Sequence, residues 1–167
     1  MKIGIDFGIT HTDVVKVSSD EISFHSAPSS LIQGSIEKVV HSFEISNEIE
    51  AIFVTGGKSS DLSNTFNGIP VTYMNEINSI AHGAKKLYGL KESALIVSTG
   101  TGTACVHFDG VSGNHMGGIA VGGGMLCGLG SLLFNNGDAL EIDEFAEKGD
   151  KSKIDFLIGD VVNKIGN

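Results

Sequence analysis

KIGIDFGITHTDVVKV, residues 2–17, places two short apolar runs on either side of a polar turn that contains glycine. The first run, Lys2 to Asp6, and the second, Val14 to Val17, predict two strands of a hairpin. A third strand is expected at Ile22 to His25, after a turn over residues 18–21. The fold therefore opens with a predicted meander of three antiparallel strands.

Helices and strands alternate after this meander. Helices are expected at 36–43, with Ser35 as N-cap, at 59–66 and at 75–88, and strands at 51–55 and 71–74. Three antiparallel strands followed by two strands that are each reached through a helix predict a mixed five-stranded sheet with helices on both faces. This is the ribonuclease-H-like layout, and it fills a predicted first domain, residues 1–91.

The same pattern begins again in residues 92–167, the predicted second domain. Strands are expected at 94–98, 103–109 and 116–121, and helices from the glycines 122–124 through Phe134, at 141–148 and at 151–164. The last two strand–helix units of a second sheet are missing from this pattern. The sequence therefore predicts a duplicated α/β fold whose second half is incomplete.

The composition excludes several classes of function. All 11 cationic residues are lysines, and they face 20 carboxylates, which gives a net charge of −9 and argues against binding to nucleic acid or to a membrane surface. No apolar run approaches the roughly 20 residues needed to cross a bilayer, and the N-terminus lacks a signal peptide, so a cytoplasmic protein is expected. Cys105 and Cys127 lack the spacing of metal ligands and are expected to be structural thiols.

Three loops rich in glycine and hydroxyl groups suit phosphate binding. Residues 6–13 and 98–103 each join two apolar strands, so a pair of such hairpins could hold a polyphosphate from both sides of a cleft. The glycines of residues 117–124 lead into an apolar helix whose free N–H groups favour an anion, although close backbone packing explains them as well. Asp6, at the end of a strand, is a candidate ligand of magnesium or of its waters.

Glu76 has two interpretations. Asn75 can cap the following helix, and Glu76 can simply complement the dipole of that helix. A carboxylate at this position could also act as a general base. The residues alone leave both roles open.

Five ordered motifs resemble those of the type II pantothenate kinases, a branch of the acetate and sugar kinase, Hsp70 and actin superfamily. The motifs are Gly4–Thr10, Val54–Gly57, Asn75–Glu76, Ser98–Thr103 and Gly117–Gly124. The resemblance implies an actin-like ATPase fold and a kinase that uses ATP and magnesium. It further implies transfer of the γ-phosphoryl group to the primary hydroxyl of pantothenate, the first step of coenzyme A synthesis.

The resemblance also implies roles for single residues. Glu76 matches the catalytic base, and His115 falls where the family usually has an arginine that contacts pantothenate. Asp13 falls where many members have a lysine. The positions that match nucleotide-binding segments are Asp6, Phe7, Gly8, Ile9, Thr10, His11, Thr12, Asp13, Thr101, Gly123, Gly124 and Met125.

Partners follow from the same resemblance. The family is dimeric, and its members run well past the last residue of this chain, so either a homodimer or a second chain is expected to cover the unfinished second sheet. Three alternatives to the kinase stay open. One is a non-catalytic or regulatory homologue that binds a nucleotide or a ligand like coenzyme A, another is one half of a split kinase, and the weakest is an ATPase activator.

Overall fold

The computed structural model describes residues 1–19, 21–45, 49–59, 62–153, 155, 158–159 and 162. These residues form a first compact unit, Met1–Gly124, and a second unit, Met125–Asn167. The first unit contains two sheets, and the second contains helices.

The first sheet is mixed, with strand order β3-β2-β1-β4-β6-β5. Its strands are β1 (Lys2–Phe7), β2 (His11–Val17), β3 (Ile22–Pro28), β4 (Ala51–Thr55), β5 (Thr65–Phe66) and β6 (Ile69–Tyr73). β1, β2 and β3 are antiparallel neighbours, whereas β1, β4 and β6 run parallel. Because parallel strands end at the same edge of a sheet, the last residues of β1 and β4 lie together there.

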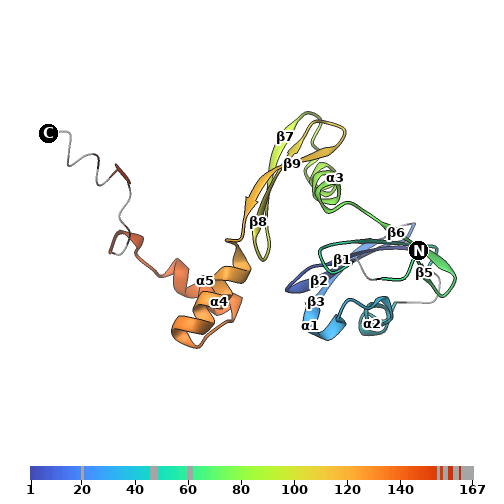
Figure 1. Ribbon diagram of the computed structural model, residues 1–167, viewed down its shortest axis with the longest axis horizontal. Coiled ribbons are helices and arrows are strands. Elements are labelled where there is room, and N and C mark those ends of the chain that lie inside the picture. Colours follow the sequence, from blue (N-terminus) through green and yellow to red (C-terminus); the bar gives the residue numbers. More distant parts are fainter. Residues whose placement is uncertain are drawn as a thin grey trace. The chain divides into compact units, whose positions relative to one another are not determined.

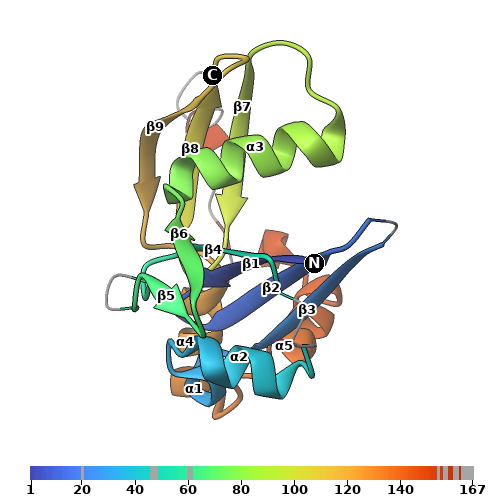
Figure 2. The same ribbon diagram turned by 90° about the vertical axis from the view of Figure 1, so that its right-hand side faces the viewer.

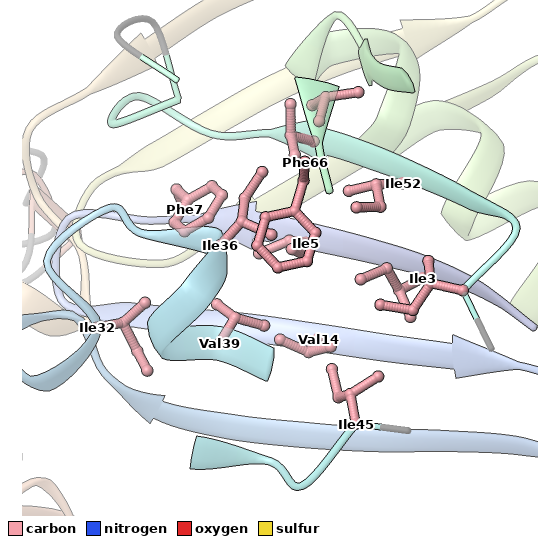
Figure 3. Close-up of a cluster of buried hydrophobic side chains, with 13 residues drawn as sticks. Ile3, Ile5, Phe7, Val14, Ile32, Ile36, Val39, Ile45, Ile52 and Phe66 are labelled. Atoms are coloured by element: carbon pink, nitrogen blue, oxygen red, sulfur yellow. The ribbon is translucent and has the colours of Figure 1, made fainter. Parts of the chain in front are cut away.

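Two short helices cover one face of this sheet, α1 (Ser29–Ile32) and α2 (Ile36–Ser42). They lie on the same side of β1, β2 and β3 (Figure 1). The Ser35 side chain accepts a hydrogen bond from the Lys38 N–H at 3.2 Å, which confirms the predicted N-cap. Ile36 and Val39 of α2 pack against alternate residues of β1, among them the buried Phe7 (Figure 3).

The region between β4 and β6 differs from the expectation. The helix predicted at 59–66 is wrong in its last residues, and residues 60–61 lie outside the described chain. Thr65–Phe66 instead pairs with Ile69–Pro70 as a hairpin. The turn residues Asn67 and Gly68 have φ of 50° and 81°, the left-handed conformation that tight hairpin turns require. This hairpin gives the sheet a sixth strand in place of the predicted five.

The second sheet has the order β7-β8-β9, with β7 at Ala94–Thr99, β8 at Thr103–Phe108 and β9 at Gly113–Ile119. Helix α3 (Glu76–Tyr88) packs along these three strands (Figure 2). The buried residues of this contact are Ala81, Val106 and Phe108. The predicted first domain placed α3 on the first sheet, and in the structure this helix packs on the second sheet instead. The mixed α/β fold itself is confirmed. The boundary between residues 91 and 92 stays a prediction.

The turn between β8 and β9 is held by Asp109. Its carboxylate accepts hydrogen bonds from the N–H groups of Val111 and Ser112, both at 2.8 Å. These bonds favour the ionised form and lower the pKa of Asp109 to about 2. Asp109 thus belongs to the turn, and β8 ends at Phe108, one residue before the predicted end of that strand.

The second unit contains α4, which begins at the end of the first unit (Gly123–Phe134), and α5 (Ala139–Glu147). The Asp138 side chain caps α5 by accepting from the N–H groups of Leu140 and Glu141. Of the helix predicted at 151–164, Lys151–Lys153 forms a 3₁₀ turn, and most of the remainder lies outside the described residues. Within the described chain, no helix has the length and apolar character needed to span a membrane.

Candidate active site

The first glycine loop joins β1 to β2 through a tight turn. A Cβ atom at Gly8 would lie only 2.5 Å from the His11 carbonyl oxygen, so a side chain has no room there. Ser29, the first residue of α1, fixes the loop with two hydrogen bonds. Its hydroxyl donates to the Gly8 carbonyl at 2.8 Å, and its N–H donates to the Thr10 carbonyl at 2.8 Å. The loop is therefore built as a fixed turn.

The predicted nucleotide contacts in this loop divide into two groups. The side chains of Phe7 and Thr12 are buried, each 1% exposed, and the Thr12 hydroxyl bonds that of Ser29 at 3.1 Å. These two residues can reach a ligand only through their backbone. Ile9, Thr10, His11 and Asp13 are exposed, and Gly8 is partly exposed.

The second glycine loop, residues 100–102, meets the first. The hydroxyl oxygens of Thr10 and Thr101 are 2.9 Å apart and share a hydrogen bond. The contact joins residues 91 positions apart in the sequence. The two loops expected to bind phosphate therefore do lie side by side.

The third glycine segment packs against the second loop. The Gly123 N–H donates to the Gly100 carbonyl at 2.8 Å. A Cβ atom at Gly124 would lie 2.5 Å from the Thr101 Cγ2, so the backbone passes close to that side chain. Met125 is the first residue of the second unit, and its role at the site stays a prediction.

Two acidic side chains beside the first loop, those of Asp13 and Glu76, act on a third, that of Asp6. Asp6 and Asp13 are cross-strand neighbours on β1 and β2. The Asp6 side chain reaches the surface, yet surrounding protein removes part of its water, and this is the main reason that its pKa is raised. The negative charges of Glu76, and then of Asp13, raise the pKa of Asp6 further. The site therefore favours a cation near Asp6.

The arrangement suits a magnesium ion for which the protein supplies only some of the ligands. Among the described residues, no group of three or more His, Cys, Asp and Glu side chains could hold a metal ion. Mg²⁺ at kinase sites commonly takes one or two carboxylates and completes its shell with phosphate oxygens and water. The residues present fit such an ion, with Asp6 as its ligand or as an acceptor from its waters.

Glu76 lies in the first turn of α3. The Asn75 side chain accepts from the Asn78 N–H at 3.0 Å, so Asn75 is the N-cap. The Glu76 carboxylate is left exposed and makes no side-chain hydrogen bond within the described chain. It is thus available to a ligand near Asp6.

His115 lies on the strand that packs against the first turns of α3. The Gly113 N–H donates to the side-chain oxygen of Asn78 at 2.9 Å, and a Cβ atom at Gly113 would lie 2.7 Å from the Ile77 carbonyl oxygen. His115 is two residues further along β9, on the same face, and is exposed. The structure brings the strand of His115 to the helix of Glu76.

A cavity of about 550 Å³ opens beside Asp6 on the sheet face opposite α1 and α2. The strand register explains which residues line the cavity. On this face of the sheet, paired residues of neighbouring strands form one polar row across the sheet and, two residues earlier along β1, one apolar row. The polar row is Ser26, Asp13, Asp6 and Thr55, and the apolar row is Phe24, Val15, Gly4 and Phe53. The Thr55 hydroxyl in the polar row has no hydrogen-bond partner within the described chain, so it can serve a ligand.

Two residues of this region were missed by sequence reasoning. Ser29 organises the first loop but follows a strand without any recognisable motif. Lys58 donates from its ammonium group to the Ile9 carbonyl at 3.0 Å. The signal for Lys58 was available, since it directly follows the motif Val54–Gly57 after a buried strand.

Comparisons with known proteins find kinases among the proteins that this chain resembles. A model of the Fumble family matches residues 90–166. The type II pantothenate kinase of Staphylococcus aureus strain USA300 is 32% identical over 164 residues, which are 95% of this chain and 58% of that protein. The type II pantothenate kinase of the bovine strain RF122 is 31% identical over the same shares. This chain thus spans little more than half the length of the curated relatives it matches.

Solved structures share the fold at low identity. A protein described as a 2-dehydro-3-deoxygalactonokinase of Sinorhizobium meliloti aligns with a TM-score of 0.55 at 7% identity, over 78% of this chain and 56% of its own. A protein described as an N-acetylmannosamine kinase of Listeria monocytogenes aligns with a TM-score of 0.53 at 16% identity, over 88% of this chain and 69% of its own. Both structures share the fold of this chain, which confirms the predicted fold class.

Sequence and fold agree on one relationship. The alignment with the curated relatives covers nearly the whole chain, and the solved structures that align with it share its fold. The chain is a homologue of the type II pantothenate kinases.

Proposed function

We propose that this protein is an ATP-dependent kinase that transfers the γ-phosphoryl group to the primary hydroxyl of pantothenate. One geometric observation supports this most strongly: the hydrogen bond between Thr10 and Thr101, which joins two glycine loops beside the carboxylates of Asp6 and Glu76. The names of the curated relatives supply the substrate.

Each residue has a defined task in this proposal. The backbone of residues 8–10, Thr101 and the glycines 123–124 hold the phosphates of ATP. The Asp6 carboxylate orients magnesium, which when bound neutralises charge on the phosphates. Glu76 accepts the proton of the acceptor hydroxyl while the oxygen forms its bond to the γ-phosphorus. The bond from that phosphorus to the β–γ bridging oxygen breaks, and ADP leaves with the electron pair.

His115 is proposed to contact the acceptor. Its imidazole cannot form the two parallel hydrogen bonds that a guanidinium group gives to a carboxylate. The carboxylate of pantothenate would therefore be held by a single hydrogen bond here. The remainder of the acceptor can extend into the cavity beside Asp6.

A second candidate is one half of a kinase that needs further polypeptide, or a nucleotide-binding homologue without activity. Exposed apolar side chains of the second sheet favour this reading: Leu95, Val97, Met116 and Ile119, between 58% and 66% exposed. We propose that a second copy or a second chain covers them and that the protein acts in the cytoplasm.

The test is calorimetric titration of the 167-residue chain with a non-hydrolysable ATP analogue and magnesium, followed by pantothenate. The kinase proposal predicts nucleotide binding at micromolar concentration and phosphorylation of pantothenate when ATP is supplied. Nucleotide binding without turnover would favour the second candidate. Absence of any binding would contradict the kinase and the nucleotide-binding homologue, and would favour one half of a kinase that needs further polypeptide.

A further inference from the structure

Lys58 is fixed against the first phosphate loop by its backbone. It lies in the turn after β4, and its N–H donates to the Phe7 carbonyl at 3.1 Å. Gly56, two residues earlier, has φ of 93° and no room for a side chain beside the Phe7 carbonyl and the Asp6 carboxylate. The turn therefore packs directly against the end of β1.

The side chain of Lys58 also reaches that loop. Its ammonium group donates one hydrogen bond, at 3.0 Å, to the Ile9 carbonyl. An ammonium group has three N–H donors, so two remain available. Within the described chain, Lys58 forms no ion pair with a carboxylate.

The charge around the loop makes such a cation necessary. Asp6, Asp13 and Glu76 place three acidic side chains near the loop, and such a group would repel a polyphosphate. The chain has no arginine, so among side chains that stay fully charged at neutral pH only its lysines can supply positive charge. Lys58 lies at the carboxyl ends of the parallel strands β1 and β4, the edge at which open α/β sheets bind ligands.

We propose that Lys58 supplies the positive charge that holds the phosphate chain of ATP at the first loop, and that its bond to Ile9 keeps the ammonium group aimed at that site. This assignment rests on the proposed kinase function. It names a phosphate-binding residue that the sequence motifs do not include.

The test compares three variants by calorimetric titration with magnesium and two probes, a non-hydrolysable ATP analogue and inorganic tripolyphosphate. K58M removes the charge and K58R retains it. K85M is the matched control, because the ammonium group of Lys85 also donates to a backbone carbonyl, that of Gly110 at 3.2 Å. Circular dichroism melting curves check that all variants are folded.

We expect K58M to weaken binding of both probes by about tenfold or more, K58R to stay within about threefold, and K85M within about twofold of the parent chain. Binding by K58M should also depend less steeply on salt, which a purely structural role would not produce. Unchanged affinity in K58M, with the parent chain binding normally, would overturn the assignment of Lys58 alone. Failure of the parent chain to bind either probe would overturn the kinase proposal and this assignment with it.

Discussion

At the scale of single residues, the Asp6 carboxylate, which we propose holds magnesium, also lowers the stability of the fold. Its pKa is raised in the folded protein above the ordinary value of 3.8. At pH values between 3.8 and the raised pKa, the folded state binds more protons than the unfolded chain. The free energy of unfolding therefore falls as the pH rises through that window. At neutral pH the ionised carboxylate therefore destabilises the fold, and a bound cation should reverse this effect.

Replacing Asp6 with asparagine should raise the melting temperature at pH 7 and remove stabilisation by magnesium with an ATP analogue. The gain in unfolding free energy should stay below about 1 kcal/mol, because the carboxylate is exposed and screened. Thermal melts between pH 3.5 and 7, with and without the ligand, measure both effects. A gain that persists at pH 3.5 would contradict the electrostatic cause, and Asp143→Asn on α5 is a control for removal of an exposed charge.

Glu76 and Asn75 allow the catalytic and structural roles of one helix end to be separated. We expect Glu76→Gln to lower kcat for phosphoryl transfer by about 10²–10⁴-fold while nucleotide affinity stays within about twofold. Asn75→Ala should instead cost about 1 kcal/mol of stability, since it removes the N-cap bond to Asn78. Steady-state kinetics and chemical denaturation of both variants measure the difference. Full activity in Glu76→Gln would exclude it as the base.

At the scale of elements, Gly122 and Gly128 both lie in glycine-rich sequence, but their surroundings in the structure differ. A Cβ atom at Gly122 would lie 2.7–2.8 Å from backbone atoms of Gly102 and Gly100, whereas nothing lies within 4 Å of one at Gly128 on α4. Gly122→Ala should therefore push the third glycine segment away from the second loop. Gly128→Ala only removes backbone freedom from a helix.

We expect Gly122→Ala to destabilise the fold by about 1–3 kcal/mol and to weaken nucleotide binding. Gly128→Ala should be neutral or stabilising by up to about 1 kcal/mol. Urea denaturation and the calorimetric titration used for the parent chain measure the two properties. Equal stability of the two variants would show that the close backbone approach at Gly122 does not constrain the fold.

The elements also show how far sequence patterns reach. β4 was predicted with its observed bounds because Gly56-Gly57 follows its apolar run. α3 and α4 were each predicted to within one residue at their starts, which the N-cap Asn75 and the glycines 122–124 mark. The β5–β6 hairpin was missed although Asn67-Gly68 between Phe66 and Ile69 is a strong hairpin signal. The packing of α3 on the second sheet could not be read from a local pattern, since an amphipathic helix does not specify which sheet its apolar face will meet. The meeting of Thr10 with Thr101 was predictable only because both loops had the same strand–turn–strand form.

At the scale of the whole molecule, the described chain buries its apolar residues unequally. Thirteen buried residues fill the core of the first sheet, whereas the second sheet and α3 bury three. Along β7, Ile96 packs toward α3, but Leu95 and Val97 point to the opposite face and are 66% and 58% exposed. Apolar faces of this kind usually contact other protein.

Replacing Leu95 and Val97 together with threonine should therefore abolish self-association of the 167-residue chain while leaving its melting temperature nearly unchanged. Threonine is β-branched, which strands favour, so the strand is retained while the exposed surface becomes polar. Ile96→Thr is the matched control, because it places a hydroxyl against the α3 contact and should cost about 1–3 kcal/mol of stability without altering the exposed face. Sedimentation velocity at increasing protein concentration measures association. A parent chain that stays monomeric throughout would show that this face does not bind a second copy, which would leave a different polypeptide as its cover.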